Sequence, residues 1–579
     1  MNRSPAADKP YSSAAKAIDK AFGKVQGGLF RLLTARLGRK DIPSYEDYTY
    51  ESKSTFFKGT DGELSGGTWS AGFARGSVIP ACWRCNADGT PSESGMCLNA
   101  PHATGGYQTF VTKIYADQFM NTLVLSCGDN GESKKLLIFI SVDGAGISSA
   151  TADKMRAAII EALKSRGVSP ENIIGCNISA THCHAALDTL GMSVAELKNN
   201  KFKPHKENGH SVHPEMEATL VMRAAETAGS AYDRMENGDL YFFETEKTGG
   251  VNDKLNCGVK VKNNFSCFLF EGASGEKTLL TNIGAHPTSY GAWHNNNMMC
   301  ADYPHFMALA LEAEGCNLVF TQSAQASVSG PYVEFDEADE RNARAGEYVA
   351  AHRQTMQDWC NLYGREYAEK WHAELETDLA GHMRKGVLLA LFILGAADKS
   401  HKVVPSLKVS NRESLIPFDY GVMELACVSG LLGTNAVKTK LAPSGYGVMT
   451  ETNCIELGGE FMLLTAPGEL SPAIVFGSDE AYKGHSLWNG KTSWSGKTWQ
   501  YKNLYDLVLE KTGKKLILLG ITNNELGYIY PDICTPHSLL GTLMFFRENP
   551  GDMCNCMLLT PGTECGSMLT KQLTEIIGE

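Results

Sequence analysis

The chain has 579 residues, of which 43% are hydrophobic, so it can bury a large core in one to three domains. Its formal net charge of -12 argues against nucleic acid or an anionic membrane as the main partner. The first residues lack the apolar core of a signal peptide and the 17 cysteines are scattered, which predicts reduced thiols in the cytoplasm. The longest apolar run, Gly386 to Ala397, is too short to span a bilayer and is predicted to be a buried strand or helix.

Residues 1–60 are predicted to form an N-terminal extension, followed by the main domain over residues 61–579. Between Ala14 and Lys40, apolar residues recur at helical spacing and basic residues fill much of the remainder, which indicates an amphipathic helix. Two interpretations are open for this helix. We favour packing on the main domain with a solvated basic face, and the alternative is a weak contact with a membrane surface.

Residues 60–130 are rich in Gly, Ser and Thr and are predicted to form short strands and loops. They contain a C-x-x-C motif made of Cys82 and Cys85, with Cys97 and His102 further along the chain. These four residues could hold a structural zinc ion, but such sites usually have a second C-x-x-C pair. Free or disulfide-paired thiols are therefore favoured.

A strand-helix-strand unit follows. Leu136 to Val142 is an apolar strand, Ser148 to Lys164 has one apolar helical face, and Ile173 to Ile178 is a second apolar strand. Strands joined by a helix are usually parallel, with a right-handed crossover. The predicted fold class is therefore α/β, with mixed, partly parallel sheets layered with helices. In such sheets the active site is expected at the carboxyl ends of the strands.

Two histidines separated by one residue, His182 and His184, follow the second strand. If the segment is extended, both imidazoles face one cavity, and Cys183 points to the opposite side. Imidazole is a common zinc ligand and also an effective acid or base near neutral pH. Taken alone, an H-x-H pair favours two structural histidines with satisfied polar groups, and the rest of the sequence changes that weighting.

The same arrangement recurs along the chain, because further apolar runs end in loops that carry polar residues. The recurring runs and their polar residues are Thr278 to Ile283 with His286, Asn317 to Phe320 with Ser329, Phe461 to Leu464 with Glu469, and Leu516 to Ile521 with Tyr528.

A polar segment from Asp336 to Glu376 is predicted to form a helical layer over the core.

Taken in order, these motifs resemble the neutral/alkaline ceramidase family of zinc amidohydrolases along most of residues 70–545. I-S-A-T-H-C-H is similar to the family's S-A-T-H-T-H, and G-A-H-P-T-S to its A-V-H-P-T-S. The segments F-T-Q-S-A-Q-A-S-V-S-G-P, L-L-T-A-P-G-E and L-G-Y-I-Y resemble later family segments. Residues 61–579 would then be a ceramidase-like catalytic domain. About 50 residues follow Tyr528, so no C-terminal β-sandwich domain is expected.

The resemblance implies roles for individual residues. His182 and His286 would bind Zn2+, with Glu469 and Tyr528 completing the ligand set. His184 would be the general base and acid, and Ser329 a catalytic residue, as nucleophile or as substrate contact. The implied reaction is hydrolysis of the amide bond of a small N-acyl compound, such as ceramide or a related N-acyl lipid, by metal-activated water.

Departures from the family pattern leave two other functions open. The family's G-P-G-G after the second histidine is here A-A-L-D, and its T-T-x-E-E-Y after the tyrosine is here Y-P-D-I-C. The segment that supplies a substrate-contacting arginine has no clear counterpart near Val251 to Asn256. One alternative is a catalytically inactive ceramidase-like binding protein. The other is a serine or cysteine hydrolase, although no G-x-S-x-G motif is present.

Overall fold

The structure is a computed structural model. It describes residues 13–48, 61–84, 117–128, 135–246, 264–288, 298–326, 385–419, 421–477, 501–545 and 557–578, together with a few single positions between these ranges. The predicted helical segment Asp336 to Glu376 lies outside the described residues, apart from two positions.

A nine-stranded sheet forms the first layer of the fold. Only its two end pairs, β11 with β9 and β5 with β6, are parallel, and the other neighbours run antiparallel. The strand order is β11 (Cys316–Gln322), β9 (Lys277–Ile283), β8 (Asn264–Gly272), β7 (Glu236–Glu246), β2 (Thr68–Ser77), β4 (Phe119–Gly128), β5 (Leu136–Val142) and β6 (Ile173–Ala180), with β12 (His401–Lys402) beside β7.

A six-stranded sheet forms the second layer. Its order is β1 (Asp61–Ser65), β13 (Ser406–Pro417), β15 (Tyr446–Leu457), β16 (Phe461–Thr465) and β18 (Lys515–Leu519), with β14 (Asn435–Lys438) beside β15. In this sheet only β16 and β18 run parallel. Two short parallel pairs complete the strands that the structure describes, β3 (Lys113–Ile114) with β10 (Met298–Met299) and β17 (Glu469–Leu470) with β19 (Tyr528–Ile529).

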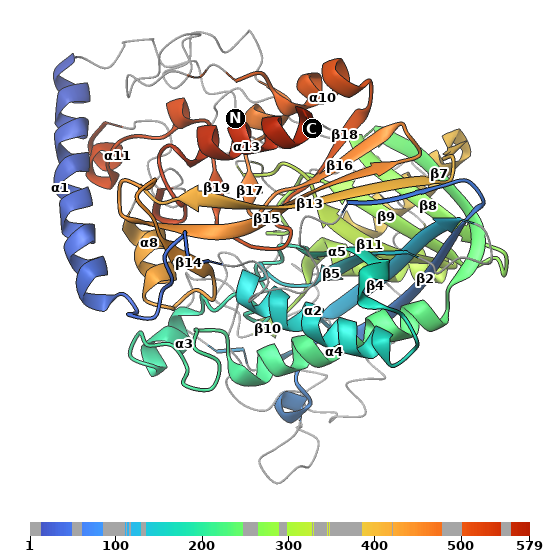
Figure 1. The fold of residues 1–579 in the computed structure, drawn as a ribbon. Coiled ribbons are helices and arrows are strands. Elements are labelled where there is room, and N and C mark those ends of the chain that lie inside the picture. The colour runs from blue at the N-terminus through green and yellow to red at the C-terminus, as the bar shows by residue number, and fades with distance from the viewer. Residues whose placement is uncertain are drawn as a thin grey trace.

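The two sheets pack face to face, and helices cover their outer faces (Figure 1). Trp69, Phe139 and Phe242 of the larger sheet share one buried cluster with Val409 and Phe461 of the smaller sheet. The helices over the larger sheet are α2 (Ser149–Lys164), α4 (Pro214–Asp233), α5 (Asp302–Ala313) and a helix over residues 385–396, and those over the smaller sheet include α8 (Gly421–Val428), α9 (Pro472–Val475), α10 (Leu504–Thr512) and α13 (Cys565–Gly578).

The structure confirms the predicted α/β class and the strand-helix-strand unit. Strand β5 has the predicted bounds, β6 continues two residues further to Ala180, and the two strands are parallel. The hydroxyl oxygen of Ser148 accepts a hydrogen bond from the backbone N–H of Thr151 and caps α2. The apolar run from Gly386 to Ala397 forms a helix rather than a strand.

The prediction of short strands between residues 60 and 130 is confirmed for β1 and β3 but is wrong for β2 and β4. Strands β2 and β4 each have ten residues and pair along their whole length. Ser70, Thr122 and Ser126 are fully buried in them, and the hydroxyl groups of Thr122 and Ser126 form hydrogen bonds. These small polar residues interrupt the apolar pattern, so the sequence did not indicate long buried strands.

The N-terminal helix is present as α1 (Ser13–Leu37) and packs against α8 and α11 (Leu539–Phe545), which confirms the favoured interpretation. Several of the apolar residues that indicated the helix, including Ile18 and Leu29, are nevertheless exposed. The carboxylate of Asp19, which is fully buried, accepts hydrogen bonds from the backbone N–H of His537 and the hydroxyl of Ser538. The opposite face of α1 leaves apolar side chains exposed, with Val25 at 71% and Leu32 at 73%. Separation of residues 1–60 from the main domain stays a prediction.

None of the helices among the described residues combines the length and the apolar character that crossing a lipid bilayer requires.

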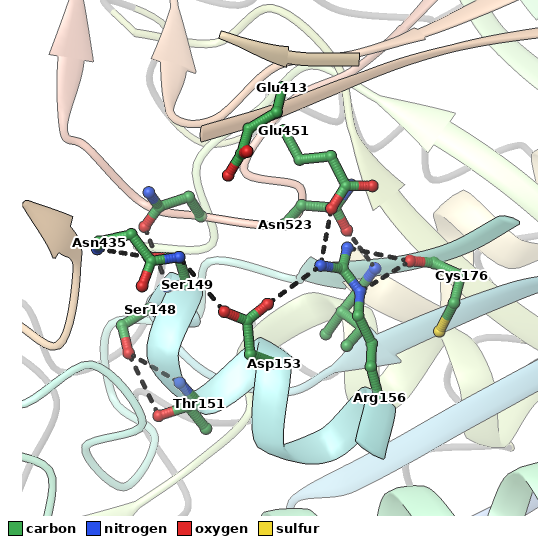
Figure 2. Close-up of polar contacts among 12 residues, drawn as sticks. Ser148, Ser149, Thr151, Asp153, Arg156, Cys176, Glu413, Asn435, Glu451 and Asn523 are labelled. Atoms are coloured by element: carbon green, nitrogen blue, oxygen red, sulfur yellow. Dashed lines mark hydrogen bonds and ion pairs between the residues drawn. The ribbon is translucent and has the colours of Figure 1, made fainter. Parts of the chain in front are cut away.

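A buried cluster of charges joins α2 to both sheets. Figure 2 shows the guanidinium of Arg156, on α2, facing Asp153, Glu451 and the backbone of Cys176. The guanidinium lies 2.7 Å from Glu451 on β15 and donates to the carbonyl oxygen of Cys176 on β6 at 3.1 Å. Burial, together with the charges of Glu451 and Asp153, raises the pKa of nearby Glu413 to about 8. This cluster fixes the end of the larger sheet against the smaller one.

The ends of several strands meet although the strands are distant in the sheet order. The side-chain N–H group of Gln322, at the end of β11, donates to the carbonyl oxygens of Thr181 at 2.8 Å and Ala285 at 3.1 Å. Thr181 directly follows β6, and Ala285 follows β9. Gln322 also forms a β-bridge with Gly520, which follows β18. The loops after β6, β9, β11 and β18 therefore gather at one place.

Candidate metal centre

His182 lies two residues beyond β6 and has a left-handed backbone, with φ at 67°. The segment is therefore not extended at this residue, so the alternation that predicted a shared cavity does not apply there. A positive φ is costly for a residue with a side chain and is often found at functional sites. The ring Nδ1 atom of His182 lies 2.6 Å from the carbonyl oxygen of Ala145.

His286, in the loop after β9, is held in the same way. Its Nδ1 atom lies 2.6 Å from the carbonyl oxygen of Val328, and its side chain is fully buried. A carbonyl oxygen can only accept a hydrogen bond, so Nδ1 carries the proton in both His182 and His286. In the neutral rings, both Nε2 atoms then present a lone pair, as metal-bound histidines do.

Both Nε2 atoms point at the same carboxylate oxygen. Glu469 Oε2 lies 3.0 Å from Nε2 of His286 and 3.4 Å from Nε2 of His182. Burial alone would raise the pKa of Glu469, and positive charge at the imidazoles, carried by a proton or by a bound cation, holds it well below its usual range. The lone pairs on the two Nε2 atoms and the carboxylate oxygen of Glu469 repel one another unless positive charge lies between them. Two imidazoles and one carboxylate are a usual ligand set for catalytic zinc, so these residues fit the ion.

His184 belongs to the same group. Its Nε2 atom lies 3.2 Å from Nε2 of His182, and one nitrogen from each of His182, His184 and His286 lies within 4.8 Å of the others. His184 is the most exposed of the three rings. The structure therefore brings together both histidines of the H-x-H pair, and the geometry suits His184 either as a ligand or as a proton carrier beside the ion.

Tyr528 lies next to Glu469 because β17 and β19 pair in parallel, with these two residues in register. The ring of Tyr528 stacks near that of His286, with centroids 6.5 Å apart. A cavity of about 100 Å³ opens beside the group. Its lining consists of Ala145, His182, His184, Leu190, Met192, Met423, Leu432, Glu469, Glu525, Gly527, Tyr528 and Leu559.

Sequence reasoning missed two residues of this site. The side-chain N–H group of Gln325 donates to Glu469 Oε2 at 3.4 Å. Glu525 lines the cavity and is 4% exposed, and its Oε1 atom accepts a hydrogen bond from the N–H of Gly527 at 2.6 Å. Burial and the nearby charge of Glu469 raise the pKa of Glu525. Gln325 lies in the loop that contains Ser329, and Glu525 lies in the loop that contains Tyr528. Their closeness in sequence to these predicted site residues was the signal that could have identified them.

Other predicted residues lie outside the described residues or away from the site. Ser329 lies outside the described residues, as do Cys85, Cys97 and His102. Cys82 is exposed, and its Sγ atom lies 3.8 Å from a carboxylate oxygen of Glu215. Cys183 points away from the histidines as expected, because its Sγ atom donates to the carbonyl oxygen of Ala301 at 2.8 Å.

The fold is similar to those of two solved ceramidase structures. The chain superposes on neutral ceramidase from Pseudomonas aeruginosa with a TM-score of 0.55 and 12% identity, over 89% of this chain and 74% of that one. It superposes on a ceramidase complexed with C2 with a TM-score of 0.54 and 14% identity, over 88% and 75% of the two chains. No family model and no curated protein matches the sequence. The resemblance inferred from the motifs is thus confirmed at the level of the fold.

Proposed function

We propose that this chain is a zinc-dependent hydrolase that cleaves the amide bond of an N-acyl compound, such as ceramide or a related N-acyl lipid. The observation that carries the proposal is the convergence of Nε2 of His182 and His286 on Glu469 Oε2, with each Nδ1 atom held by a backbone carbonyl. Similarity in fold to the two ceramidase structures supports the amide as the bond that is cleaved.

His182, His286 and Glu469 would hold the zinc ion, and Tyr528 would complete the set. When bound, zinc supplies a Lewis acid for the amide carbonyl and lowers the pKa of water to about 7. The backbone carbonyls of Ala145 and Val328 keep the two imidazoles in the tautomer that can bind metal.

His184 is proposed to move the proton. Its Nε2 atom lies 3.2 Å from that of His182, so it can take a proton from water beside the ion and pass it to the leaving amine. Its greater exposure suits a ring that must exchange protons, whereas the buried His182 and His286 are fixed. Ser329 stays a proposal from the family resemblance, as nucleophile or as substrate contact.

The cavity suits an apolar acyl group. Its lining includes five residues with apolar side chains, Leu190, Met192, Met423, Leu432 and Leu559. Placing the acyl chain there would bring the amide next to the histidines and Glu469, which line the same cavity. A cytoplasmic location and a weak contact of α1 with a membrane surface stay predictions.

Two substitutions separate the proposed roles. His182→Ala should lower zinc occupancy and abolish amide hydrolysis together. His184→Ala should keep zinc and reduce turnover by about 10² to 10⁴-fold. Zinc content is measured by elemental analysis, and release of fatty acid from N-acyl substrates by mass spectrometry, on the same preparations. If His182 and His184 had only structural roles, zinc content and turnover would be unchanged in both variants.

The same measurements address the alternative functions. A chain that binds zinc but cleaves no amide in a broad screen would be an inactive binding protein. Hydrolysis that persists in the metal-free protein would indicate a serine or cysteine hydrolase. Cys183 is a poor nucleophile in either case, because burial raises the pKa of its thiol well above the usual range.

A further inference from the structure

Helix α1 packs against the rest of the molecule through one face. Asp19 and Thr34 are fully buried on this face. Gly23 lies so close to the backbone of His537 that a Cβ atom would meet its carbonyl oxygen at 2.5 Å. Figure 1 shows α1 at the edge of the molecule, with α8 and α11 on one side of it. The residues on the opposite side of α1 are therefore not needed for this packing.

The opposite side of α1 carries a heptad pattern. Large apolar residues recur at every seventh position, and a small residue follows or precedes each of them at spacings of three and four. This spacing is that of the a and d positions of a coiled coil. All of these residues are exposed, with Val25 at 71% and Leu32 at 73%. We call the set the heptad seam, which consists of Ile18, Val25 and Leu32 at a and Ala14, Ala21, Gly28 and Ala35 at d.

Gly28 has no explanation in the packing of α1. It lies in the interior of the helix, where glycine is less favourable than alanine. A Cβ atom at Gly28 would meet nothing within 4 Å, whereas one at Gly23 would collide with His537. Gly23 is thus required by a contact within the molecule, and Gly28 is not. A small residue at a seam position lets another backbone approach closely.

Basic side chains border the heptad seam. Lys24 and Arg31 occupy g positions and Arg36 occupies an e position, and all three are exposed. The one acidic residue in the sequence of α1, Asp19, is buried on the packed face. Side chains at e and g select the partner of a coiled coil by charge. The seam therefore fits a helix with acidic residues at these positions.

Two other occupants fit this face less well. In a parallel pair of α1 helices, Arg31 of one copy would face Arg36 of the other, and in an antiparallel pair Lys24 would face Arg31. Two copies would therefore repel each other. A lipid surface favours helices with bulky apolar side chains on one face, whereas four of the seven residues of the heptad seam are Ala or Gly.

We propose that the heptad seam docks an amphipathic α-helix of another protein, which has apolar residues at its own a and d positions and Glu or Asp at e and g. The inference does not depend on the proposed amide hydrolysis. From Ala14 to Ala35 the seam is roughly 33 Å long, because each residue of a helix adds about 1.5 Å. The partner helix therefore needs three heptads to cover it.

The test uses a synthetic helical peptide of four heptads with leucine at a, alanine at d and glutamate at e and g. A matched control peptide has lysine at e and g. Binding to the full-length protein is followed by the fluorescence anisotropy of the labelled peptide. The glutamate peptide should bind at least about 10-fold more tightly than the lysine peptide, and added salt should reduce this difference.

Three variants test the three features of the heptad seam. Val25→Gln combined with Leu32→Gln removes apolar surface and should weaken binding of the glutamate peptide by about 10-fold or more. Lys24→Glu combined with Arg36→Glu should reverse the preference between the two peptides. Gly28→Leu has open space within this chain but obstructs a closely packed helix, so it should also weaken binding.

A control separates the seam from general hydrophobicity. Leu441→Gln changes an apolar side chain that is 66% exposed and lies outside α1, and binding should stay as in the unmodified protein. Circular dichroism and thermal midpoints are recorded for every variant. Binding of neither peptide, equal binding of both peptides, or unchanged binding after Val25→Gln with Leu32→Gln would overturn the inference.

Two further measurements examine the competing occupants. Vesicles of phosphatidylserine and phosphatidylcholine provide the lipid surface, and binding that Gly28→Leu strengthens would assign the face to lipid and reject the partner helix. Sedimentation of the protein alone provides the test for a second copy. The protein should be monomeric through this face, and a dimer that Val25→Gln dissociates would likewise reject the proposal.

Discussion

Replacing Arg156 with methionine should lower the free energy of unfolding by about 3 to 5 kcal/mol, because it leaves a buried carboxylate without its partner. Arg156 is 3% exposed and lies 2.7 Å from the Glu451 carboxylate, which is itself almost fully buried. Methionine fills a similar volume but supplies no charge and no donor. The carbonyl oxygen of Cys176 also loses its hydrogen bond from the guanidinium.

The assay is denaturant unfolding followed by intrinsic fluorescence, with the change in midpoint converted through the slope of the transition. Arg166→Met is the matched control. Arg166 lies just beyond the end of α2 and pairs with Asp233 at 2.9 Å, but it is an exposed pair. Such pairs contribute at most about 1 kcal/mol, so the control should change stability little.

A double variant tests the reasoning itself. Arg156→Met combined with Glu451→Leu removes both charges, so it should recover much of the stability lost in Arg156→Met alone. A loss for Arg156→Met no larger than that of the control would refute the argument. A double variant that is less stable than the sum of its single changes would show that Glu451 does not need Arg156 as a counter-charge.

Three further predictions follow from other parts of the structure. Removing metal with a chelator should abolish amide hydrolysis, and added zinc should restore it, as measured by release of fatty acid. Gln322→Leu removes the donors that hold Thr181 and Ala285 together, so zinc affinity measured by chelator competition should fall by about 10- to 100-fold; an unchanged affinity would show that other contacts position the loops. The pKa of Glu413 is raised from 4.5 to about 8 in the folded protein, so the folded state keeps a proton that the unfolded state loses, and stability falls as pH rises between these values. Glu413→Gln should therefore flatten this decline in unfolding experiments from pH 5 to pH 8, and an identical slope in both proteins would contradict the raised pKa.

The strands that could be predicted are those whose residues are apolar throughout. β5 is buried along its whole length, so its pattern needed no knowledge of the partner strands. β2 and β4 were not recognised as long strands because buried polar residues such as Ser70 and Thr122 interrupt their apolar patterns. The hydroxyl of Thr122 is satisfied by Thr227, 105 residues further along the chain. The pairing of β11 with β9, and the approach of β11 to β6, depend on tertiary packing that no local pattern contains.

The candidate site was predictable where the residue type restricts the chemistry. Histidine and glutamate after strand ends pointed to a metal, and the structure brings His182, His286 and Glu469 together. Their roles stay predictions. Gln322 and Glu525 were not identified, because amides and carboxyls are common in polar loops. Their importance comes from burial and from which backbone groups they contact, and both depend on the folded chain.

The gathering of distant loops has a consequence for protein synthesis. His182 and Tyr528 are separated by roughly 350 residues, which a ribosome translates in roughly 20 to 70 seconds. Glu469 also lies in the later half of the chain, so His182 and His286 are synthesised well before the carboxylate of Glu469. A nascent chain therefore cannot assemble the full set of proposed ligands. Under the proposed function, tight zinc binding would belong to the finished polypeptide, where the ion would stabilise a completed fold and would not template an early one.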